Sequence, residues 1–79
     1  MSLTQEQHTA LKAMRVEISQ AIVAKQAEEM YRGIGRVQGF LAELQIAGEI
    51  DQVAQEMLEQ EAMTNVYFQL NSLEAAHAH

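Results

Sequence analysis

Apolar residues recur along this chain at intervals of three and four positions, the spacing of an amphipathic helix. No stretch alternates between apolar and polar residues over a length that would suit a strand. The chain also lacks proline and is rich in alanine, glutamine, glutamate and leucine, all of which favour helix. The pattern therefore predicts an all-α fold.

The first predicted helix begins at Gln5. Thr4 and Gln7 have the spacing of a capping box, in which the threonine hydroxyl accepts from a first-turn amide and the glutamine side chain reaches back to the threonine amide. Apolar periodicity then continues to Ala47. We therefore predict one long helix over residues 5–47.

Two apolar lines follow this predicted helix, about 130° apart around its axis. The first line contains Leu11, Met14, Ile18 and Ile22. The second line contains Val16, Val23, Ala27, Met30, Ile34, Val37, Leu41 and Leu44, and from Ala27 its steps alternate between three and four, as in a coiled-coil seam. Because one chain has only its last part to cover both lines, we expect an interface between copies of the chain. We assign that interface to Val23, Met30, Ile34, Val37, Leu41 and Leu44.

Three glycines, Gly33, Gly35 and Gly39, lie between positions of the second line, which continues past them and favours a continuous helix. Their spacing differs by one residue from that of a dinucleotide-binding loop, and no strand precedes them, so the string does not support a nucleotide site of that type. Glycine also weakens a helix. The helix therefore either kinks or breaks at residues 33–35, or Gly35 and Gly39 form a smooth surface on which another helix packs.

Gly48 is expected to end the first helix by adopting a left-handed conformation. Asp51 suits the N-cap of the next helix, which makes residues 48–50 a tight turn. We predict a second helix over residues 51–73, a bend or a change of neighbour near Thr64, and a frayed tail over residues 75–79. Its predicted buried residues are Ile50, Val53, Ala54, Met57, Leu58, Ala62, Val66, Leu70 and Leu73. The chain should form a helical hairpin or a three-helix unit.

Length and charge restrict the classes of partner. A single domain of 79 residues is marginally stable alone, and without cysteine it has neither disulfides nor thiolate metal sites, so we expect a homo-oligomer. The net charge is −6, and every basic residue lies in the first 36 positions, which disfavours binding to nucleic acid. No apolar run is long enough to cross a membrane, and the first residues do not resemble a signal peptide, so we predict a cytoplasmic protein.

One group of residues suggests a small-molecule site. Lys25, Arg32 and Arg36 lie on one face of the predicted helix, with Tyr31 beside them. Forked arginine donors hold phosphates and carboxylates well, so this group could bind a small anionic, nucleotide-like ligand between subunits. Ion pairing with neighbouring acidic residues is the competing interpretation.

Catalytic chemistry is not indicated. The three histidines lie near the ends of the chain, and none has a second histidine at the helical spacing of a metal site. We therefore predict no catalytic residue, no metal and no cofactor. The predicted function is that of a small helical adaptor or regulatory protein that acts through protein–protein contacts. The alternative is a homo-oligomeric binder of a small anionic ligand at Lys25, Tyr31, Arg32 and Arg36.

Overall fold

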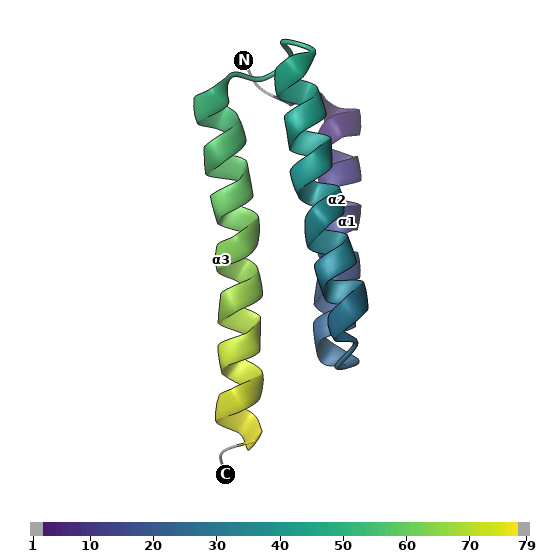
Figure 1. Cartoon of the computed structure of the whole chain (residues 1–79), viewed down its shortest axis with the longest axis vertical. Coiled ribbons are helices and arrows are strands. Elements are labelled where there is room, and N and C mark those ends of the chain that lie inside the picture. The colour runs from purple at the N-terminus through teal and green to yellow at the C-terminus, as the bar shows by residue number, and fades with distance from the viewer. Residues whose placement is uncertain (1–2, 78–79) are drawn as a thin grey trace.

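The computed structural model describes residues 3–77, and side chains as far as residue 73. Three helices follow one another in that range, and no strand occurs within it: α1 (Gln5–Val23), α2 (Ala27–Ile46) and α3 (Gln52–His77). Successive helices run antiparallel, so α1 and α3 point in the same direction (Figure 1). The bundle measures 47 × 19 × 19 Å. The structure confirms the all-α fold in its three-helix form.

The first change of direction lies at residues 24–26. Lys25 has a φ of 59°, in the left-handed region that non-glycine residues seldom occupy. The amide of Gln26 donates to the carbonyl of Ala21 over 2.9 Å, which closes the turn. The prediction of one helix over residues 5–47 is wrong, because the chain folds back at residues 24–26. The break that the sequence left open at residues 33–35 does not occur, since α2 continues through the glycines. Folding back brings both apolar lines into one core.

Of the three glycines in α2, Gly33 is the one that lies close against α1. A Cβ atom added to Gly33 would lie 2.7 Å from Cγ1 of Ile18, whereas one added to Gly35 or Gly39 would meet nothing within 4 Å. A larger residue at position 33 would therefore push the two helices apart. Gly33 is the glycine that packing requires.

The ends of the helices match the predicted caps. The amide of Gln7 donates to the Thr4 hydroxyl over 3.2 Å, and the amide of Thr4 donates to the Gln7 side chain over 2.9 Å, which completes the capping box. Gly48 has a φ of 76°. The amide of Ala54 donates to the Asp51 carboxylate over 2.7 Å. These contacts confirm the predicted start of α1 and the predicted turn before α3.

The core lies between the three helices. Val37, Leu41 and Ile50 are its largest fully buried side chains. The other buried apolar residues are Leu11, Ile18, Ala21, Ile22, Met30, Leu44, Ala62 and Val66. Three members of the first predicted apolar line are therefore buried, and Met14 packs against them.

The third helix differs from its prediction in two ways. Val53 and Met57 are exposed, so the prediction that they are buried is wrong. α3 is helical through Thr64 and extends to His77, beyond the predicted end at residue 73 and into the predicted frayed tail. The last two residues of that tail, 78 and 79, lie outside the described residues. The buried and partly buried positions of α3 follow steps of four, each of which turns their line by about 40° around the helix: Ala54, Leu58, Ala62, Val66 and Leu70.

Candidate functional site

The predicted interface between copies of the chain lies largely inside one chain. Met30, Val37, Leu41 and Leu44 are buried in the bundle core, and Ile34 is partly buried against it. Only Val23 is exposed, at 70%. Five of the six residues therefore pack within a single copy, because the turn at residues 24–26 lays α2 against α1 and α3.

A different surface remains without an intramolecular partner. Seven exposed residues of α3 lie on its solvent side at helical spacing, and we name this surface the outer α3 face: Val53, Met57, Gln60, Thr64, Tyr67, Phe68 and Asn71. None of the seven is charged, although α3 belongs to the acidic part of the chain. Phe68 is 71% exposed and Met57 is 66% exposed. The outer α3 face is therefore an uncharged stripe that carries two aromatic rings.

The outer α3 face borders α1 at Phe68. Two contacts mark the edge of α3 that lies beside α1: Arg15 pairs with Glu61 at 3.6 Å, and the Gln69 amide donates to the Ser19 hydroxyl over 3.0 Å. Phe68 follows Glu61 by two helical turns and so lies on the same edge. Along α1, the exposed side chains of Val16 and Val23 line a shallow, mostly apolar groove that also contains Ser19. Exposed apolar surface thus occurs on both helices at this edge.

Three of the four residues predicted to bind an anion lie on α2, and both arginines among them form ion pairs. The Arg32 guanidinium pairs with Glu29 at 3.1 Å, and that of Arg36 pairs with Glu17 of α1 at 3.1 Å. Lys25 lies in the turn between α1 and α2 and not on a helix face. Tyr31 is exposed on α2. Both arginines therefore face carboxylates of the same chain, and the turn separates Lys25 from the helical positions of the others.

Two kinds of feature do not occur in the part of the chain that the structure describes. Among the side chains described as far as residue 73, no group of three or more histidine, cysteine, aspartate or glutamate residues converges closely enough to hold a metal ion. Within residues 3–77, none of the helices combines the length and apolar character needed to cross a membrane.

The distribution of charged residues in the sequence indicates the outer α3 face, whereas the apolar periodicity does not. Val53 and Met57 were assigned to the core because they are apolar, yet the buried line passes through Ala54 and Leu58 on the other side of the helix. Charge is the more informative pattern. All three glutamates with described side chains in α3, at positions 56, 59 and 61, flank the stripe and leave it uncharged.

Comparison of the chain with protein-family models, with curated proteins and with solved structures gave no match.

Proposed function

We propose that this protein is a non-enzymatic helical adaptor or assembly factor of the cytoplasm, which self-associates and acts through protein–protein contacts. The observation that carries the proposal is the outer α3 face, where Val53, Met57, Tyr67 and Phe68 are each more than 60% exposed on an uncharged stripe. The centres of protein interfaces are depleted in charge and enriched in aromatic residues and methionine. This composition suits a docking surface better than a solvated helix face.

A second copy of the chain can dock on the outer α3 face without burying a charged side chain. Each copy carries a net charge of −6, so association needs a contact that buries no carboxylate. Two outer α3 faces can meet in this way, because Glu56 and Glu61 would lie at the rim, where water and salt screen their repulsion. Phe68 and Tyr67 would then act as anchors, since a few buried aromatic residues usually supply most of the binding free energy.

Sedimentation velocity over a range of protein concentrations tests this proposal. We expect wild type to form a dimer or a larger oligomer at micromolar concentration. Phe68→Glu should remain monomeric with unchanged helical circular dichroism, because a charge placed in the interface must be desolvated. Ile46→Glu is the matched control: it removes another apolar side chain, 84% exposed, and adds the same charge on α2.

The control should associate as wild type does. A wild-type protein that stays monomeric throughout the series would contradict self-association. Loss of association in Ile46→Glu but not in Phe68→Glu would show that the outer α3 face is not the interface.

A further inference from the structure

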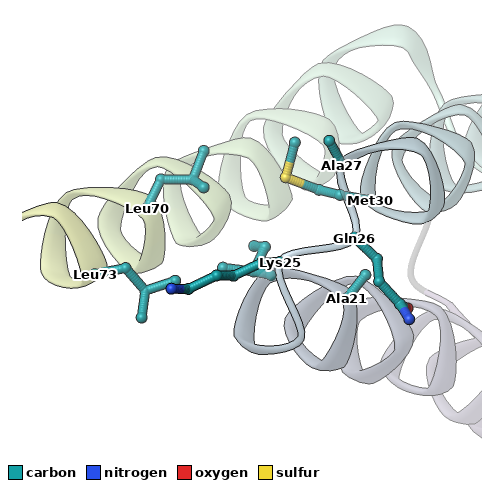
Figure 2. Close-up of a pocket in the computed structure, with 8 residues that line it drawn as sticks. Ala21, Lys25, Gln26, Ala27, Met30, Leu70 and Leu73 are labelled. Carbon is teal, nitrogen blue, oxygen red and sulfur yellow. The ribbon is translucent and has the colours of Figure 1, made fainter. Parts of the chain in front are cut away.

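A groove of about 410 Å³ lies between the α1–α2 turn and the C-terminal half of α3 (Figure 2). Its walls come from all three helices: Ala21 and Ile22 of α1, Ala27 and Met30 of α2, and Leu70 and Leu73 of α3, with Lys25 and Gln26 of the turn. It forms because α3 has 26 residues whereas α1 and α2 have 19 and 20, so α3 continues past the turn (Figure 1).

The lining combines an apolar surface with one cationic group. Six of its eight residues are apolar, and its volume lies in the range of small-molecule sites. Lys25 forms no ion pair with any carboxylate among the described side chains, unlike Arg15, Arg32 and Arg36. In Figure 2 its side chain extends from the turn in the direction of Leu73, and both residues line the groove. An ammonium group therefore lies beside an apolar surface.

The conformation of Lys25 is a second, independent feature of this groove. A φ of 59° lies in the left-handed region, which costs a lysine free energy relative to ordinary helical or extended backbone and which glycine adopts without that cost. A lysine therefore occupies a position whose backbone conformation favours glycine, and strain of this kind is common at binding sites.

We propose that this groove binds a free aliphatic carboxylate, a medium-chain fatty acid, with its head paired to Lys25 and its alkyl chain against Met30, Leu70 and Leu73. An alkyl chain suits a lining of flexible aliphatic side chains that contains no aromatic ring. A carboxylate suits the single ammonium group, whereas a cationic head would be repelled by it. The groove does not include residues of the outer α3 face, so this site does not depend on self-association.

Titration calorimetry with decanoate, below its micelle concentration, tests the inference. We expect saturable binding to wild type, and weaker binding of decyltrimethylammonium even though the protein is acidic overall. Lys25→Gln should weaken decanoate binding by about tenfold or more, the effect of losing a charged hydrogen-bond partner. Lys12→Gln is the matched control, because it removes the same charge from an exposed position of α1 outside the groove, and it should bind decanoate as wild type does.

A second variant tests the apolar part of the site without altering the core. Ala27 is exposed at the edge of the groove, so Ala27→Phe should fill it and abolish decanoate binding while helical circular dichroism is retained. Absence of saturable binding to wild type would overturn the proposal. Equal binding of the anionic and cationic probes, or unchanged binding in Lys25→Gln, would overturn it as well. Phe68→Glu should bind decanoate normally, which separates failure of this site from failure of the proposed interface.

Discussion

Gly33 and Gly35 are two residues apart in α2 yet have opposite surroundings. Gly33→Ala should lower the free energy of unfolding by about 1–3 kcal/mol, because Ile18 is buried and cannot move away from the new methyl group. Gly35→Ala should raise the free energy of unfolding by up to about 1 kcal/mol, since alanine favours helix and meets open space. Urea denaturation of dilute protein measures both values. Stabilisation by Gly33→Ala would contradict the close approach of α1 and α2.

Two residues adopt left-handed backbone, and only one of them is glycine. At Gly48, with a φ of 76°, substitution by alanine should lower stability by about 1 kcal/mol. At Lys25, with a φ of 59°, substitution by glycine should raise stability by several tenths of a kcal/mol, because relief of backbone strain outweighs the added freedom of the unfolded chain. Thermal unfolding of the two variants checks these opposite signs. Equal destabilisation by both would mean that Lys25 is not strained.

At the scale of the helices, the caps were the most predictable feature. Thr4, Gln7, Gly48 and Asp51 act within a few residues of their own positions, so local sequence determines their contacts. The turn at residues 24–26 was harder, because Ala24, Lys25 and Gln26 are all good helix formers. The sequence indicated this turn through its apolar residues, which move from the first apolar line to the second between Ile22 and Met30. That change shows where the helix must fold back for both lines to face one core.

The cap of α3 provides a test of this local determination. Asp51→Ala should lower the free energy of unfolding by about 1 kcal/mol, because the amide of Ala54 would lose its acceptor. Asp51→Asn should have a much smaller effect, since asparagine caps helices about as well. Chemical denaturation of the two variants provides the comparison. An equal loss in both would show that the carboxylate charge, rather than the hydrogen bond, stabilises this end of α3.

The outer α3 face was less predictable than the caps, for a physical reason. Apolar periodicity predicts which residues avoid water but not whether the surface that covers them belongs to the same chain. Val53 and Val66 look equally apolar in the sequence, yet one is exposed and the other is buried. Only the packing of α1 and α2 against α3 separates them. The sequence therefore identifies the apolar residues of the candidate site, but it does not show that they remain exposed on the surface of the folded chain.

In the molecule as a whole, the apolar surface available for self-association lies on the outer α3 face and not in the core. The residues of the predicted coiled-coil seam pack within one chain, and Val37 among them is only 2% exposed. Val37→Asp should therefore unfold the protein at every concentration, because a carboxylate would be buried without a partner. Circular dichroism and sedimentation together check this. A variant that kept its helical signal but changed only from oligomer to monomer would show that Val37 lies between copies of the chain.

Folding and association of this protein should be coupled. If the oligomer forms only from folded chains, association stabilises the native state in proportion to the logarithm of protein concentration, and the Tm of wild type should rise as the protein is concentrated. Phe68→Glu should melt at a Tm that does not depend on concentration, because its core is intact but its outer α3 face carries a charge. Ile46→Glu should retain the wild-type dependence. Calorimetric scans over a hundredfold range of concentration distinguish these behaviours, and a wild-type Tm that is constant across that range would mean that one copy of the bundle accounts for the whole stability of the protein.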